Sequence, residues 1–162
     1  MISFINDIFS QFHNKWALVT AGDIDKHNSM TISWGSMGTL WSKPVVSVYV
    51  KPCRNTHSFL SNNDYFTVSF YPEEYRNALS LMGSLSGRHC DKDKQANLTP
   101  IELEKGITYK EAEITIVCKK IYTQDLDINA IPVDQIDRHY KVEAPHTMFI
   151  GEVIEIVKQK DA

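Results

Sequence analysis

The chain has 162 residues, of which 43% are hydrophobic and 23% are charged, so it is long enough to bury the core of one globular domain. Its 17 basic and 20 acidic residues give a formal net charge of −3, and no lysine and arginine cluster forms a basic stripe. This pattern argues against nucleic acid and anionic membrane surfaces as partners. We therefore expect a single domain over residues 1–162.

The cysteines are Cys53, Cys90 and Cys118, an odd number without Cys-x-x-Cys or Cys/His metal spacing. They favour a reduced, cytoplasmic setting and no metal. Cys53 lies beside the loop discussed below, where a bystander thiol is favoured over a sensing one.

The N-terminal residues 1–15 are predicted to form an amphipathic helix. Ile5, Ile8, Phe9 and Phe12 recur at i, i+3, i+4 and i+7, which places them on one helix face. This face is expected to pack on the domain or on a partner subunit. A helix on a membrane surface is the alternative, but the polar side lacks the lysines typical of such helices. The segment also lacks the basic start and the long apolar run of a signal peptide or membrane span.

Residues 16–21 and 29–34 are predicted to form a β-hairpin across the polar run 22–28, where His27 is expected to be solvated. In the second strand, Met30, Ile32 and Trp34 alternate with hydroxyl-bearing residues. Those residues are Ser29, Thr31 and Ser33. Gly35 and Gly38 are predicted to break the strand and to let the backbone approach a ligand closely.

Pro44 and Pro52 enclose a further predicted strand, residues 45–50, and a polar loop follows it directly. The loop residues are Cys53, Arg54, Asn55, Thr56 and His57. They look like the start of a short helix capped by Asn55 or Thr56. Free N–H groups, the positive end of the helix dipole and a guanidinium together favour a phosphate. Taken singly, these features are more often a solvated strand face and a surface arginine, and it is their combination within thirty residues that favours a phosphorylated ligand.

The second half of the chain predicts more strands and two short helices. Strands are expected at 65–70, 113–121 and 147–157, the last with a bulge at Gly151. Helices are expected at 73–82, with Gly83 as its C-terminal cap, and from Pro132 to Tyr140. The fold class is therefore mainly β with a few short helices.

Four segments resemble, in this order, the flavin reductase-like or flavoredoxin-like FMN-binding split-barrel family: NSMTISWGSMGTLWSKP, KPCRNTHSF, SGRHCDKDKQANLTP and PHTMFIGEV. The resemblance runs from about Trp16 to about Val157. It implies an antiparallel, Greek-key-like split β-barrel, a homodimer, and FMN bound non-covalently near the dimer interface.

The resemblance also implies a cofactor site. In the family the loop corresponding to residues 84–92 helps to enclose the flavin or its phosphate, and this chain keeps Ser86, Gly87, Arg88, Asp91 and Lys92. His89 replaces the usual acidic residue, which changes the local charge balance. The implied cofactor-binding residues are Met30, Thr31, Ile32, Ser33, Trp34, Trp41, Cys53, Arg54, Asn55, Thr56, His57, Ser86, Gly87, Arg88 and Lys92. Arg54, Asn55 and Thr56 would hold the phosphate and residues 30–33 the ring. Trp34 or Trp41 would wall the flavin, with core or dimer packing as the alternative.

No Ser-His-Asp order, paired carboxylates, phosphate-binding Walker loop or GxGxxG fingerprint is visible, so the reactivity must come from a cofactor. The expected function is an oxidoreductase that passes a hydride from NADH or NADPH to flavin or another acceptor. The alternative is a flavoredoxin-type carrier that exchanges electrons with a redox protein partner. A ligand-free protein on the same fold is disfavoured because the binding loops are intact. The resemblance implies that His146 lies near the flavin and nicotinamide, whereas a lone histidine at a strand start is more often structural. Hydride transfer requires no catalytic base.

Overall fold

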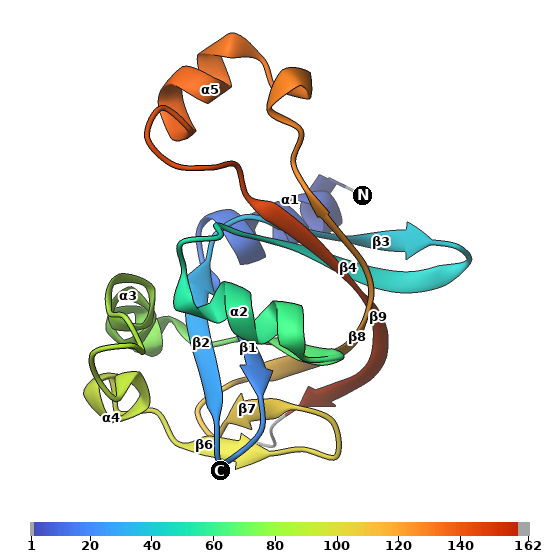
Figure 1. The fold of residues 1–162 in the computed structure, drawn as a ribbon. Coiled ribbons are helices and arrows are strands. Elements are labelled where there is room, and N and C mark those ends of the chain that lie inside the picture. The colour runs from blue at the N-terminus through green and yellow to red at the C-terminus, as the bar shows by residue number, and fades with distance from the viewer. Residues whose placement is uncertain (1, 159–162) are drawn as a thin grey trace.

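A computed structural model describes residues 2–158 of the chain, and the side chains of residues 8–158. Its main element is a seven-stranded antiparallel sheet with the order β2-β1-β5-β8-β9-β4-β3 (Figure 1). The strands are β1 (Ala17–Gly22), β2 (His27–Ile32), β3 (Gly35–Leu40), β4 (Lys43–Val50), β5 (Tyr65–Phe70), β8 (Ile114–Asp125) and β9 (Thr147–Lys158). A separate hairpin pairs β6 (Pro100–Glu102) with β7 (Ile107–Tyr109).

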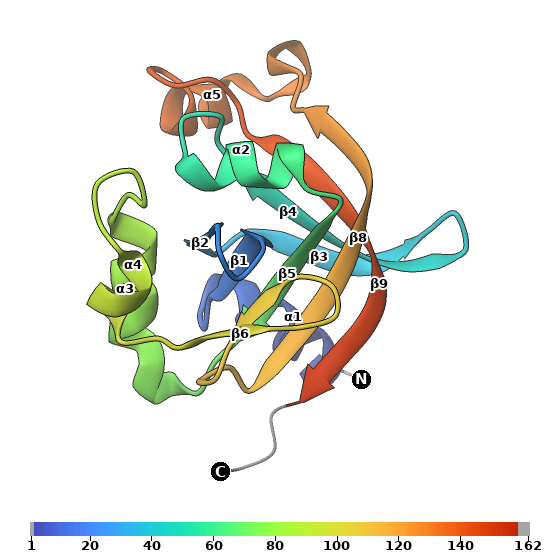
Figure 2. The same ribbon diagram turned by 60° about the horizontal axis from the view of Figure 1, so that its bottom comes forward.

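The helices lie around this sheet. They are α1 (Ile2–His13), α2 (Asn55–Asn62), η1 (Glu73–Tyr75), α3 (Arg76–Ser84), α4 (Lys92–Ala96), η2 (Ile128–Ala130) and α5 (Val133–His139). Figures 1 and 2 show α3 and α4 together on one side of the barrel, away from the projecting β3–β4 hairpin. Within residues 2–158, no helix is both long enough and apolar enough to span a bilayer.

The sheet is curled because its two edge strands follow each other in the chain. β2 and β3 lie at opposite ends of the strand order, yet only Ser33 and Trp34 connect them. Three Cα steps reach about 11 Å at most, whereas the edges of a flat seven-stranded sheet would lie roughly 29 Å apart. The edges must therefore meet at residues 33–34. Because β2 and β3 do not pair, the sheet stays open, which confirms the predicted antiparallel split barrel.

The barrel interior is apolar and is closed at one end by α1. Phe12 is buried, and its ring makes an edge contact with Phe70 at a centroid distance of 5.6 Å. Gly35 makes room for it, since a Cβ there would lie 2.4 Å from the Phe12 ring. Ile8 is half-buried as predicted, whereas Phe9 is 67% exposed, and the side chain of Ile5 lies outside the described residues.

The opposite face of β1 and β5 is covered by the β6–β7 hairpin and by α3 and α4. Leu18, Leu79, Met82 and Tyr109 form a second apolar cluster there. Hydroxyl groups bond one another beneath the hairpin: Ser69 lies 2.9 Å from Thr115 and 3.2 Å from Thr108. The sheet is thus buried on both faces in this region.

Several predicted boundaries are wrong for identifiable reasons. Gly35 and Gly38 lie inside strand β3, whose two-residue turn to β4 is Trp41–Ser42, with φ of 51° and 60°. Positive φ at both positions is the geometry of a type I′ turn, for which Asn-Gly is the usual sequence. Gly83 lies inside α3 instead of capping it, and β8 continues four residues past the predicted 121.

The predicted bulge at Gly151 is misplaced. Gly151 itself pairs with Lys120 of β8, and the irregular pairing lies on either side of it. The register with β8 shifts between Val117 and Cys118 and again between Lys120 and Tyr122. A Cβ on Gly151 would lie 2.5 Å from Cys118 Cβ and 2.6 Å from the Phe66 ring. Glycine is therefore required here by close packing where β9 crosses the core.

We expect Gly151→Ala to lower the free energy of unfolding by about 1–3 kcal/mol, because the added methyl overpacks two fully buried neighbours. Gly38→Ala is the matched control, since nothing lies within 4 Å of its Cβ position. Urea denaturation of both variants tests this. Equal stability of the two would contradict the packing explanation.

Candidate functional site

The first candidate site begins at the N-terminus of α2. Arg54 is the N-cap residue, in extended backbone conformation with no side-chain cap hydrogen bond, so the predicted cap at Asn55 or Thr56 is wrong. The Thr56 hydroxyl instead accepts a hydrogen bond from Asn28 Nδ2 at 2.6 Å. The first N–H groups of α2 therefore have no side-chain acceptor from the cap, which leaves them suited to an external anion.

The loop after α3 forms the opposite wall. Arg88 Nη1 donates to the Cys53 carbonyl at 3.1 Å, and Arg54 Nη2 donates to the Gly83 carbonyl at 2.5 Å. Gly87 lets the loop approach, because a Cβ there would lie 2.0 Å from Asn28 Oδ1. We call the resulting cavity of about 200 Å³ the Arg54 pocket. Its lining residues are Asn28, Met30, Cys53, Arg54, Asn55, Thr56, Ser84, Leu85, Ser86, Gly87, Arg88 and Lys92.

Lys92, at the start of α4, supplies the third cation of this pocket and is only 5% exposed. Its Nζ donates to the Ser29 carbonyl at 2.6 Å. Burial, and next the nearby Arg54 charge, lower the pKa of Lys92 to about 8. Among the side chains that the structure describes, no aspartate or glutamate lines the pocket, so an anion is the group that would relieve this repulsion.

A hydrogen-bonded network lies behind Lys92. His27 Nε2 lies 2.8 Å from Asp93 Oδ2, and the Tyr109 hydroxyl donates to Asp93 Oδ1 at 2.7 Å. Tyr109 also bonds Ser29 Oγ, which bonds Thr20 Oγ1, each at 2.7 Å. The bond to Asp93 raises the pKa of His27, which is therefore a paired residue and not the solvated one predicted. The network fixes β2 and α4, the two elements that hold Lys92.

A second cavity is lined by residues of the same two segments. On β2, Met30 lines the Arg54 pocket and Ile32 lines the second cavity. After β4, Lys51 lines the second cavity, whereas Cys53 and Arg54 line the Arg54 pocket. We call this cavity of about 220 Å³ the Trp34 pocket. Its lining residues are Ile32, Ser33, Trp34, Tyr49, Lys51, His139 and His146.

His146 lies in the Trp34 pocket in its neutral form. Its Nδ1 is 2.9 Å from the Tyr140 hydroxyl, and its ring lies 5.0 Å from that of Trp34. Burial, followed by the charges of Lys51 and His139, lowers the pKa of His146 to about 4. At neutral pH the ring can accept or donate a hydrogen bond but carries no charge.

Residues 126–146 form a projecting segment beside this pocket, with α5 at its far side (Figure 1). His139 makes an edge contact with Trp34 at 5.1 Å. Lys51 Nζ donates to the His139 carbonyl at 3.3 Å and forms an ion pair with Glu143, which lowers the pKa of Glu143. Cys53 Sγ lies 3.6 Å from the same carboxylate. Polar and aromatic contacts thus fasten the segment over the Trp34 pocket.

The structure separates some predicted site residues from the two pockets. The Thr31 hydroxyl donates to the Leu79 carbonyl at 2.5 Å, and Ser29 belongs to the buried network, so these two members of the hydroxyl face do not point toward a ligand. His57 bonds Thr147 Oγ1 at 2.8 Å and lines neither pocket. Trp41 is 62% exposed at the hairpin tip, against Tyr122, and also lines neither. The other predicted residues all line one pocket or the other.

The model of the flavin reductase like domain matches residues 9–162 of this chain. The chain belongs to the flavin reductase-like family. A comparison with curated protein sequences gave no match.

Three solved structures illustrate the fold of this flavin reductase-like domain. An FMN-binding protein from Thermus thermophilus with bound 1-cyclohex-2-enone is 20% identical, with a TM-score of 0.70 over 91% of this chain and 74% of that one. Flavoredoxin from Methanosarcina acetivorans is 20% identical, with a TM-score of 0.72 over 90% and 69%. An NADH:FAD oxidoreductase from Streptomyces globisporus is 18% identical, with a TM-score of 0.70 over 97% and 82%. At these identities the likeness establishes the fold.

Sequence reasoning missed several residues that line or adjoin the two pockets. Asn28 was assigned to a turn, although an amide next to a predicted hydroxyl strand is a signal for a buried polar contact. Lys51 lies two residues before the predicted phosphate loop and could have been included with it. Tyr49, His139 and Glu143 come together only through tertiary packing, so no local pattern identifies them.

We expect sulfate to bind in the Arg54 pocket and to bind more weakly as pH rises through about 8. Lys92 attracts an anion only while it is protonated, whereas Arg54 and Arg88 stay charged throughout. Lys92→Met should weaken binding at pH 7 by roughly tenfold and should remove this pH dependence. Calorimetric titration from pH 6.5 to 9.5 provides the measurement.

Lys94→Met serves as the control for Lys92, because it removes a charge from the exposed side of the same helix. Identical pH profiles for wild type and Lys92→Met would show that Lys92 is not the titrating ligand.

Proposed function

We propose that the chain binds FMN non-covalently and acts as a flavin-dependent oxidoreductase. The observation that carries the proposal is the convergence of Arg54, Arg88, Lys92 and the N-terminus of α2 on one pocket that no acidic side chain within residues 8–158 lines. Ile32, two residues after Met30 on β2, lines the second, aromatic pocket. Membership of the flavin reductase-like family supports a flavin as the ligand.

The Arg54 pocket fits the phosphate end of FMN. Its volume of about 200 Å³ is below the roughly 300–1,000 Å³ of sites that enclose a whole ligand, so it suits a terminal group. Two guanidinium groups, one ammonium and the helix N–H groups match a dianion in charge and in hydrogen-bond donors. The Ser86 hydroxyl adds one further polar group.

The Trp34 pocket fits a flat, largely apolar ring system. Ile32 and Trp34 offer apolar contact, and neutral His146, held by Tyr140, offers one polar contact without a charge. When bound, FMN supplies hydride acceptance and transfer of one or two electrons. The protein residues would orient the ring, and the segment 126–146 would limit access of water to it.

NADH or NADPH is the proposed hydride donor, and free flavin or another small molecule the acceptor. A flavoredoxin-type carrier is the second candidate. The segment beside the Trp34 pocket carries exposed apolar side chains, Ile128, Val133 and Val142, that a redox protein partner would cover. Oxidation of reduced nicotinamide by the FMN-loaded protein distinguishes them, because a carrier turns over the nicotinamide poorly.

We expect Arg54→Ala to weaken FMN binding by roughly ten- to a hundredfold, because a hydrogen bond between charged groups contributes about 1.5–3 kcal/mol. Riboflavin lacks the phosphate, so its affinity should change little. Arg54→Lys should recover part of the loss, since the charge returns without the planar fork. Flavin fluorescence titration measures all of these affinities.

Arg138→Ala is the matched control, because it removes the same charge from an exposed position on α5. Equal loss of FMN and riboflavin affinity in Arg54→Ala would indicate damage to the fold. If Arg54→Ala lowers the affinity for neither compound, the phosphate ligands would be assigned to Arg88 and Lys92 instead.

We further propose a homodimer. Trp41 at the hairpin tip and Ile156 near the end of β9 are large apolar side chains left exposed in one subunit. Burial of such groups commonly drives association. Light scattering at micromolar concentration should give twice the chain mass, and a monomer mass would contradict the proposal.

A further inference from the structure

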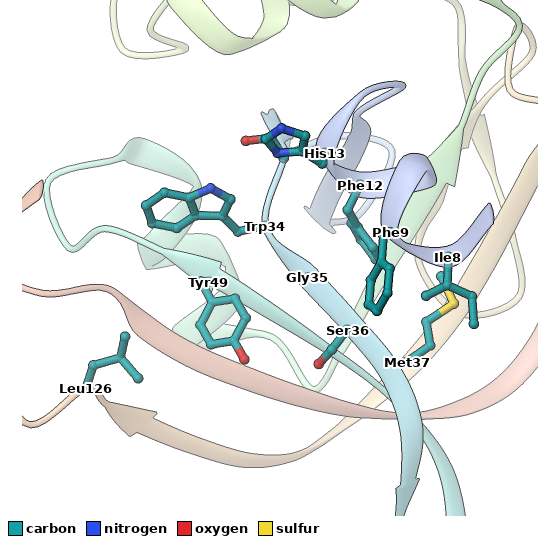
Figure 3. A pocket seen from close by; sticks show the side chains of 11 residues that line it. Ile8, Phe9, Phe12, His13, Trp34, Gly35, Ser36, Met37, Tyr49 and Leu126 are labelled. Carbon is teal, nitrogen blue, oxygen red and sulfur yellow. The ribbon is translucent and has the colours of Figure 1, made fainter. Parts of the chain in front are cut away.

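A third cavity, of about 490 Å³, lies between α1, β3 and β4. Figure 3 shows Phe9, Phe12 and Ile8 on one side of it and Trp34 and Tyr49 on the other, with Ser36 between them. His13, Ser33, Gly35, Met37 and Leu126 are the other residues that line it among the side chains described, 8–158. No aspartate, glutamate, lysine or arginine is among these residues, so we call it the apolar pocket.

The apolar pocket adjoins the Trp34 pocket directly. Ser33, Trp34 and Tyr49 line both cavities. Ser33 and Trp34 are the two residues that join the edge strands, so both cavities open at the seam of the barrel. A molecule in the apolar pocket would therefore lie next to the ring system proposed for the Trp34 pocket.

Tyr49 gives this pocket a polar anchor. It lies on β4, paired with Met148, and is half-buried. None of the described residues forms a hydrogen bond with its phenol hydroxyl, which is therefore available to donate to a ligand. A cavity of this size with apolar walls and few polar groups is typical of a small-molecule site.

We propose that the apolar pocket binds the electron acceptor, and that the acceptor is a small cyclic or aromatic carbonyl compound whose oxygen accepts a hydrogen bond from Tyr49. The binding follows from the cavity itself, whereas the role as acceptor rests on the proposed flavin function. Phe9, Phe12 and Met37 would contact the ring of the compound, and charged acceptors would be disfavoured by the lining.

The test uses acetophenone and α-methylstyrene, two probes of nearly equal shape that differ in having a carbonyl oxygen or a methylene group. Each is titrated into the full chain, without and with FMN, while the NMR signals of the Met37 methyl group and the Trp34 indole N–H are followed. Both probes should shift both signals saturably. Tyr49→Phe should weaken acetophenone binding by about two- to tenfold and leave α-methylstyrene unchanged.

Two further variants complete the test. Tyr65→Phe, which removes a phenol hydroxyl from β5 outside the pocket, should change neither affinity. Ser36→Trp should fill the cavity and abolish binding of both probes while FMN still binds.

Absence of saturable shifts would overturn the proposal, as would equal weakening of both probes in Tyr49→Phe. Shifts of the same signals on raising the protein concentration alone would also overturn it, because a second copy of the chain would then occupy the pocket. Saturable probe binding in the absence of FMN, together with failure of FMN to bind, would support the pocket and refute the flavin function separately.

Discussion

The two-residue link between β2 and β3 determines the architecture of the whole molecule. Because Ser33 and Trp34 must join the opposite edges of a seven-stranded sheet, the sheet curls until those edges meet. The edges are not paired, so this seam is where backbone and side chains remain accessible. The Trp34 pocket and the apolar pocket open here, and the Arg54 pocket follows along β2. The pockets thus form where the edge strands β2 and β3 meet without pairing.

Charge burial at the Arg54 pocket opposes the stability of the free protein. Lys92 is almost fully buried near Arg54, and its lowered pKa means that the folded state holds this proton less tightly than the unfolded state. The native fold is therefore penalised below the pKa of Lys92, and the penalty decreases as pH rises toward the ordinary lysine value. The network through Ser29, Tyr109 and Asp93 holds the ammonium group in place despite this cost. A site kept ready for an anion in this way is preorganised by its surroundings.

The sequence predicted the elements whose signals are local. Period-two alternation identified β1, β2 and β5, the 3.6-residue period identified α1 and α5, and the loop after Pro52 identified the start of α2. The hairpin turn Trp41–Ser42 was missed because neither residue favours the positive φ that the turn requires. The β6–β7 hairpin was missed because its strands have three residues each, too few to establish a period. The hydroxyl face of β2 was recognised but assigned to a ligand, because alternation does not reveal that α3 and α4 cover the outer side of the sheet. Most predicted pocket residues nevertheless line a cavity, since Arg54 and Gly87 lie in short loops next to the predicted helices α2 and α3, and Lys92 follows the second of these loops at the start of α4.

The segment between β8 and β9 is joined to the barrel at a narrow base. The Leu126 N–H donates to the His146 carbonyl at 3.0 Å. This hydrogen bond joins the two ends of the segment directly after the last paired residues of β8 and β9. Beyond that point the segment contributes no residue to either apolar cluster, and solvent-accessible polar and ring contacts attach it to the body. Its length and composition can therefore change without disturbing strand register or core packing. The segment could therefore be exchanged in protein engineering. A different segment grafted between residues 126 and 146 would alter which molecules reach the Trp34 pocket and would leave the Arg54 pocket unchanged.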